Sequence, residues 1–133
     1  MRTILFKAKR ADNGEWIEGN QFKIWSKAYI LWGITNGVPD RIEVIPETVC
    51  QYTGLNDKNG VKVFESDRIK SKKFEYYIVF ENGAFYAVSI DLKDFDGKPF
   101  KWMLAKRFED LNTDYVVIGN IHDKEKSETP INQ

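Results

Sequence analysis

The chain has 133 residues, of which 42% are hydrophobic and 30% are charged, and this balance excludes an intrinsically disordered chain. Its 20 basic and 20 acidic side chains cancel to a formal net charge of +0, so the field of the whole protein gives no general attraction to nucleic acid or to an anionic membrane. The longest uncharged apolar stretch covers residues 28–38, well short of the roughly 18 residues that a membrane helix needs. We expect one domain or two very small ones, in the cytoplasm and without a membrane partner.

Asn-Gly pairs punctuate the chain and predict β-hairpins. They occur at residues 13–14, 36–37, 59–60 and 82–83, and an Asp-Gly pair follows at 96–97. The residues of such a pair tolerate the positive φ of a type I′ turn, which is the commonest tight connection between antiparallel strands. The sequence therefore predicts a succession of antiparallel hairpins.

The segments between these turns are rich in β-branched and aromatic residues, which favour strands. In chain order the predicted strands cover residues 4–9, 15–18, 28–34, 41–45, 75–80, 84–90, 100–104 and 115–118. The clearest hairpin joins the strands on either side of Asn82-Gly83. Helical periodicity is poor, and a short helix fits only at residues 105–111 or 25–31. The predicted fold is mainly β, with little helix.

A change of pattern near Pro46 suggests two parts. Residues 1–47 have the pattern of β-hairpins joined by polar turns, and residues 48–122 that of a compact β unit. Residues 123–133 are mostly polar and charged, with one large apolar residue, Ile131, and they predict a disordered tail. The alternative is that the first two parts form one integrated domain.

Residues 51–60 have the pattern of a strand end followed by a tight turn. Gly54 closes the predicted strand, and residues 56–60 form a polar turn. Tyr52 is expected to place its ring in the core and its hydroxyl on a backbone partner. The motif thus indicates a turn specified by shape, and a loop that contacts a ligand is the alternative.

Three stretches of the chain carry a family resemblance. They are VCQYTGLNDKNG at residues 49–60, VFESDRI at 63–69 and VVIGNIH at 116–122. They resemble the runs QYTGLKDKNG, IYEGDIV and VIGNIYE of the YopX family, small proteins found mainly in bacteriophages and prophages. The resemblance implies a mainly β fold of antiparallel hairpins with an SH3-like barrel in the C-terminal part. It also implies a phage or prophage origin, and it brings no established activity.

The chain departs from the family pattern at two positions of the second motif. Ser66 and Arg68 stand where the family tends to have Gly and Ile. Glycine serves where φ must be positive, so the serine implies that the backbone is unstrained at this position. Arg68 is expected to face solvent.

Side chains with catalytic or metal-binding chemistry are sparse. Cys50 is the single cysteine, which excludes an intramolecular disulfide, and we interpret it as a small buried side chain. The alternative, a nucleophile, needs a nearby base, and the only histidine, His122, is far away in sequence. Residues 55–66 and 92–103 mimic calcium loops, but each lacks the first ligand and the bidentate Glu at the last position. We expect no catalytic residue, no cofactor and no metal site.

The best candidate for a recognition surface lies where basic side chains run into aromatic ones. Its residues are Lys70, Lys72, Lys73, Tyr76 and Tyr77. On a small barrel such residues hold phosphates and stack bases, and the alternative is a solvated loop that enters a hydrophobic strand. Because the net charge is zero, we predict a non-catalytic protein-binding or self-associating accessory module, with a protein partner or a second copy. The alternative is a nucleic-acid-binding module that uses residues 70–77.

Overall fold

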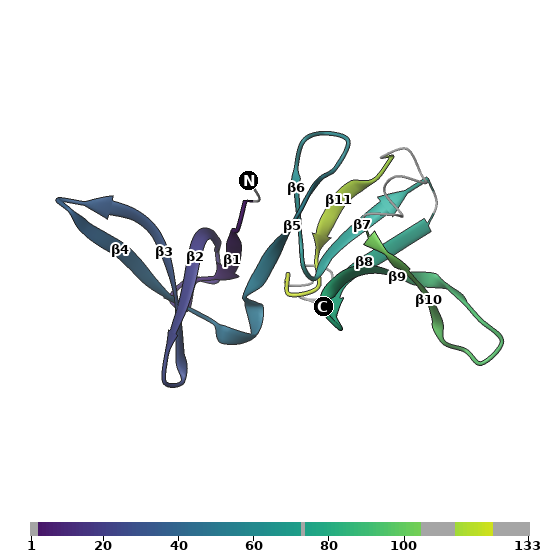
Figure 1. Ribbon diagram of the computed structural model, residues 1–133, viewed down its shortest axis with the longest axis horizontal. Coiled ribbons are helices and arrows are strands. Elements are labelled where there is room, and N and C mark those ends of the chain that lie inside the picture. Colours follow the sequence, from purple (N-terminus) through teal and green to yellow (C-terminus); the bar gives the residue numbers. More distant parts are fainter. Residues whose placement is uncertain (1–2, 73, 105–113, 124–133) are drawn as a thin grey trace, which may run out of the picture.

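The protein is built almost entirely from antiparallel β-strands, which confirms the mainly β prediction. The computed structural model describes residues 3–72, 74–104 and 114–123, and their strands form two sheets (Figure 1). Sheet I has the order β4-β3-β2-β1-β5-β6, and sheet II the order β10-β9-β8-β7-β11. The elements of sheet I are β1 (Phe6–Lys9), β2 (Trp16–Ile24), β3 (Lys27–Thr35), β4 (Val38–Val44), the 3-10 helix η1 (Pro46–Thr48), β5 (Cys50–Asn56) and β6 (Lys62–Phe64). Those of sheet II are β7 (Asp67–Ser71), β8 (Phe74–Glu81), β9 (Ala84–Lys93), β10 (Pro99–Met103) and β11 (Val116–Asn120).

The helix suggested at residues 25–31 is wrong. Trp25 lies in a turn with a φ of 55°, and the chain from Lys27 onward is strand β3, paired on both sides with β2 and β4. Ala28 and Ile30 are fully buried, and the residue between them lies on the opposite face. This is the two-residue period of a strand, enforced by pairing with both neighbours.

Two further predictions concern residues outside the described ones. The helix suggested at residues 105–111 lies there entirely, and so does the predicted tail beyond Asp123. Asp123 itself, the first residue of the predicted tail, is placed and accepts a hydrogen bond from the indole of Trp16 at 2.8 Å. Within the described ranges, no helix has the length and apolar content to cross a membrane.

Gly19 lets sheet I bend. Strand β2 pairs with β1 up to Gly19 and with β3 from Asn20 onward. A Cβ atom on Gly19 would lie 2.1 Å from the carbonyl oxygen of Leu31, so only glycine allows the two backbones to approach this closely. Strands β2, β3 and β4 therefore project from the body of the molecule as an arm, seen at the left of Figure 1.

One backbone bridge, between Arg10 and Val44, brings the end of β4 back to the end of β1. The core beneath it consists of the buried side chains Ala8, Ala28, Ile30 and Val44. No ladder between the described strands closes either sheet into a barrel. The SH3-like arrangement therefore stays a prediction.

The predicted hairpin across Asn82-Gly83 is confirmed. Strands β8 and β9 pair in register from Tyr76 with Ser89 to Glu81 with Ala84. Asn82 and Gly83 have φ angles of 52° and 81°, as both central residues of a type I′ turn require.

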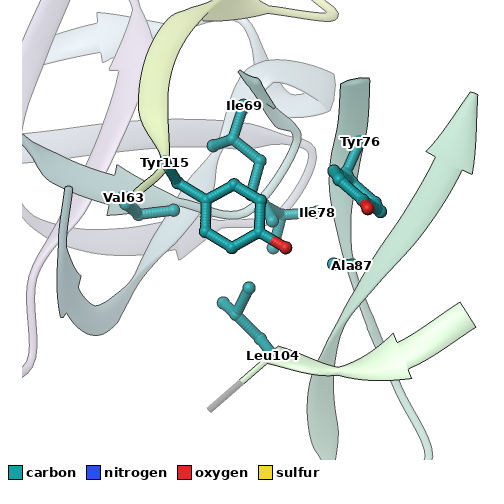
Figure 2. Close-up of a cluster of buried hydrophobic side chains, with 7 residues drawn as sticks. All are labelled: Val63, Ile69, Tyr76, Ile78, Ala87, Leu104 and Tyr115. Atoms are coloured by element: carbon teal, nitrogen blue, oxygen red, sulfur yellow. The ribbon is translucent and has the colours of Figure 1, made fainter. Parts of the chain in front are cut away.

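The larger core lies on one face of sheet II. It consists of Val63, Ile69, Tyr76, Ile78, Ala87, Leu104 and Tyr115, which converge in Figure 2. The rings of Tyr115 and Trp102 both meet the ring of Tyr76 edge-on, at centroid distances of 5.6 Å. Each large side chain buried here stabilises the fold by roughly 1.5–3 kcal/mol before the entropy cost of ordering it, so this cluster anchors sheet II.

The chain passes from sheet I to sheet II at the corner Glu65-Ser66. Ser66 has a φ of 71°, so the expectation of an unstrained backbone at this position is wrong. Its N–H donates to the carbonyl of Ile78 at 2.8 Å, and its own carbonyl accepts from the N–H of Ile121 at 2.9 Å. These two bonds hold the backbone in the left-handed region, which costs a residue with a Cβ atom roughly 1–2 kcal/mol.

The first motif also differs in two details from what the sequence predicts. Strand β5 does not end at Gly54 but continues to Asn56, because Gly54 takes a φ of 90° and the register with β6 shifts there as in a β-bulge. Tyr52 is buried as expected. Its hydroxyl, however, donates to the side-chain oxygen Oδ1 of Asn56 and not to the backbone.

Candidate functional site

The structure separates the residues of the predicted recognition surface. Lys70 is exposed on β7, and Lys72 is exposed in the turn before β8. Tyr76 is fully buried in the core, while Tyr77 is half-buried on the opposite face of β8. Lys73 lies outside the described residues. Lys70 and Tyr77 thus share the outer face of sheet II, and Tyr76 is not available to stack on a base.

Two of the cations on this outer face are already paired with carboxylates. Arg68 faces outward as expected, directly opposite Tyr77, and its Nη2 lies 2.9 Å from Oε1 of Glu75. Lys101 forms an ion pair with Glu81, and that hydrogen bond raises the pKa of Lys101. A paired cation has less charge to offer a phosphate, so the outer face is a weaker candidate for nucleic acid than the sequence suggested.

A buried polar cluster joins β1, β7 and β11. Asp67 is fully buried, and its carboxylate accepts from Nζ of Lys7 at 3.0 Å, from Nδ2 of Asn120 at 2.8 Å and from the N–H of Phe64 at 2.8 Å. The ammonium of Lys7 also lies 4.5 Å from the ring centroid of Trp16. Asp67 and Asn120 belong to the second and third motifs, so those motifs meet in the structure and hold the two sheets together.

Asp57 of the first motif is also a hydrogen-bond acceptor, and its bonds shape a turn. Its Oδ1 accepts from the N–H groups of Asn59 and Val61, and its Oδ2 accepts from the N–H of Val117 at 2.9 Å. Asp94 likewise accepts backbone N–H groups in the turn between β9 and β10. Both calcium-like loops are thus hairpin turns in which the carboxylates accept hydrogen bonds from backbone N–H groups. Over residues 3–72, 74–104 and 114–123, no three or more His, Cys, Asp or Glu side chains gather to hold a metal.

Cys50 is buried, as predicted, and its Sγ donates to the carbonyl of Thr48 at 3.2 Å. Burial raises the pKa of the thiol to about 11. The protonated thiol is a poor nucleophile, so the structure favours the interpretation of Cys50 as a small packed side chain.

The strongest candidate for binding is an exposed apolar surface on the arm, which the sequence analysis missed. A groove of about 610 Å³ is lined by Phe22, Leu31, Val38, Pro39 and Arg41; together with Tyr29 and Ile34 these residues form what we call the arm face. The rings of Phe22 and Tyr29 stack at 5.1 Å, and the guanidinium of Arg41 lies 5.3 Å from the ring of Tyr29. Ile34 is 72% exposed and Val38 is 63% exposed.

A β-bulge in β3 brings Leu31 and Ile34 to the same side of the arm. Leu31 pairs with Arg41 but Gly33 pairs with Asp40, so β3 contains one extra residue between them. The extra residue reverses the order in which successive side chains point to the two faces of the sheet, so Ile34 lies on the same face as Leu31. Simple alternation places these two residues on opposite faces, which is why the sequence did not reveal the surface. The one available signal was a glycine inside the strand pattern, which often marks a bulge.

Comparison with known proteins identifies the family of the chain. A family model described as YopX protein matches residues 5–126, which is most of the chain and includes all three motifs. A search of curated proteins finds no match. The motifs that carry the resemblance supply Asp57, Asp67 and Asn120, whose hydrogen bonds tie the strands together. The chain belongs to the YopX family.

Proposed function

We propose that the chain is a non-catalytic protein-binding module that associates with a second copy of itself through the arm face. The exposed apolar groove around Phe22 and Leu31 carries the proposal. A contiguous exposed apolar surface on a small protein commonly marks an interaction site. Aromatic rings flanked by an arginine, here Tyr29 and Arg41, are the residue types enriched at the centres of protein interfaces.

The charge of the molecule supports a second copy as the partner. With a formal net charge of +0, two copies do not repel one another at long range. Charged side chains of both signs surround the arm face, including Lys27 and Glu43, which lie 3.9 Å apart. A rim that carries both signs can complement its own copy across a two-fold axis.

Nucleic acid is the alternative ligand and has weaker support. Its best site would be the outer face of sheet II, where Arg68 is ion-paired with Glu75 and Lys101 with Glu81. Catalysis also has little support, because the thiol of Cys50 is protonated at neutral pH. A binding role fits these features better than a chemical one.

We also propose a phage or prophage origin and a location in the cytoplasm of the bacterial host. The resemblance of the motifs supports the origin. The thiol of Cys50 is buried and forms no disulfide, which suits a reducing compartment. We further propose that residues 48–122 form an SH3-like unit, supported by the meander from β7 to β10 and by the return of β11 to pair with β7.

Sedimentation equilibrium of the full chain tests the proposed self-association. We expect the wild-type protein to shift from monomer to dimer as its concentration rises, and Ile34→Glu to remain a monomer. Ile118→Glu is the matched control, because Ile118 is also an exposed isoleucine in a strand, 43% exposed on β11, and it should dimerise like the wild type. A wild-type chain that is monomeric at all concentrations, or equal weakening by both substitutions, would contradict the proposal.

A further inference from the structure

A second cleft lies at the junction of the two sheets, away from the arm face. It has a volume of about 960 Å³, and its lining includes Lys9, Arg10, Gly14, Thr48, His122 and Asp123. Hydrogen bonds fix the walls relative to one another. The N–H of Lys9 donates to Oγ1 of Thr48 at 2.9 Å, and the indole of Trp16 donates to Oδ1 of Asp123 at 2.8 Å. The volume is in the range of pockets that hold small molecules.

Lys9 is an unusual residue in this cleft. It is only 8% exposed, yet its ammonium pairs with no carboxylate of the described residues. Its one charge-related contact there is with the ring of Trp16, 5.6 Å from the centroid. Lys7, two residues earlier on the same strand, shows the usual arrangement, because its ammonium is paired with Asp67. The stem of Lys9 is buried while its ammonium reaches solvent, so an anion supplied from outside can approach this unpaired cation.

The two carboxylates that line the cleft are already engaged elsewhere. Asp12 accepts from Nε and Nη2 of Arg10 at 3.0 and 2.8 Å, and this pairing lowers the pKa of Asp12. Asp123 accepts from the indole of Trp16 and, at 2.9 Å, from the backbone N–H of Asn120. Neither carboxylate forms an ion pair with the ammonium of Lys9.

We propose that this cleft binds a small molecule through a carboxylate or phosphate group, with the ammonium of Lys9 as the counter-charge. His122 also lines the cleft, and its imidazole is a second hydrogen-bonding group for the same ligand. An ion pair inside a partly enclosed cleft is screened less by salt than one on an open surface. Lys9 is thus the residue whose removal should matter most for affinity.

Proton NMR of the His122 ring tests the proposal, because His122 is the only histidine in the chain and its signals report on this cleft alone. Inorganic phosphate and acetate are titrated separately at constant ionic strength. We expect a saturable shift of the His122 signals with at least one anion. The anion that produces it identifies whether the ligand group is a phosphate or a carboxylate.

Substitutions then locate the counter-charge. Lys9→Met should weaken the affinity for the anion roughly tenfold or more, and Lys62→Met, which removes an exposed lysine outside the cleft, should leave it unchanged. Lys9→Gln is a second variant that keeps a polar side chain, and the amide spectrum checks the fold of each. The proposal is overturned if neither anion gives a saturable shift or if Lys9→Met responds like the wild type. Loss of folding in both Lys9 variants would also overturn it, because Lys9 would then be structural.

Discussion

Replacing Lys7 with methionine should destabilise the protein strongly. Its ammonium lies 3.0 Å from Oδ1 of Asp67, and the side chains of the two residues are 15% and 1% exposed. Methionine keeps an apolar side chain but leaves the carboxylate of Asp67 buried without its cation. Removing one partner of a buried pair costs about 3–5 kcal/mol. Because Asp67 keeps its hydrogen bonds from Asn120 and Phe64, we expect the low end, about 3 kcal/mol.

Urea unfolding at neutral pH measures this free energy, and a thermal scan should show a melting temperature lower by on the order of 10 °C. Lys9→Met is the matched control, since Lys9 is on the same strand, also lies near the ring of Trp16 and pairs with no described carboxylate. We expect it to change the free energy of unfolding by less than about 1 kcal/mol. If Lys7→Met and Lys9→Met unfold at the same denaturant concentration, the buried pair does not hold the sheets together as argued.

Three further predictions concern other parts of the chain. Ser66→Gly should be more stable than Ser66→Ala by about 1 kcal/mol in urea unfolding, because glycine accepts positive φ; equal stabilities would contradict strain at this corner. The pKa of the Cys50 thiol is raised from an ordinary 9.0 to about 11. This shift should stabilise the folded state fully below pH 9, and the contribution should be lost as the pH rises through 11. Slow alkylation by iodoacetamide at pH 8 checks the burial of the thiol, and rapid alkylation of the folded protein refutes it. Single-stranded DNA should bind no tighter than about 10 μM at physiological salt in an anisotropy titration, and sub-micromolar binding lost in Lys70→Glu would favour the nucleic-acid alternative.

Local signals in the sequence predicted much of the architecture. The turn at Asn82-Gly83 and the strands on either side of it form as expected, because the φ preference of the pair and the β-branched and aromatic residues of the strands act over a few residues. The burial of Cys50 and Tyr52 was also predictable, because the chemistry of these side chains favours it. The family, too, was identifiable from three short motifs.

Local sequence signals could not predict the contacts between residues that are distant in sequence. The strain at Ser66 arises because the chain changes sheets there and its backbone must bond to Ile78 and Ile121, which are distant in sequence. The pairing of Lys7 with Asp67 joins residues 60 positions apart. No periodicity encodes such contacts, because they depend on how the sheets meet.

The candidate sites likewise depend partly on the sequence alone and partly on the tertiary structure. The sequence by itself determined the antiparallel hairpins, the scarcity of metal-ligand and nucleophile residues and a net charge of zero, all of which follow from residue types and near-neighbour spacing. Only the tertiary structure decided that Tyr76 belongs to the core and that a bulge before Gly33 gathers an apolar surface on the arm. It also decided that Lys9 is buried in a cleft between segments from both ends of the chain. The physical reason is that strand register and sheet packing choose which side of each strand faces solvent, and these are properties of the whole chain.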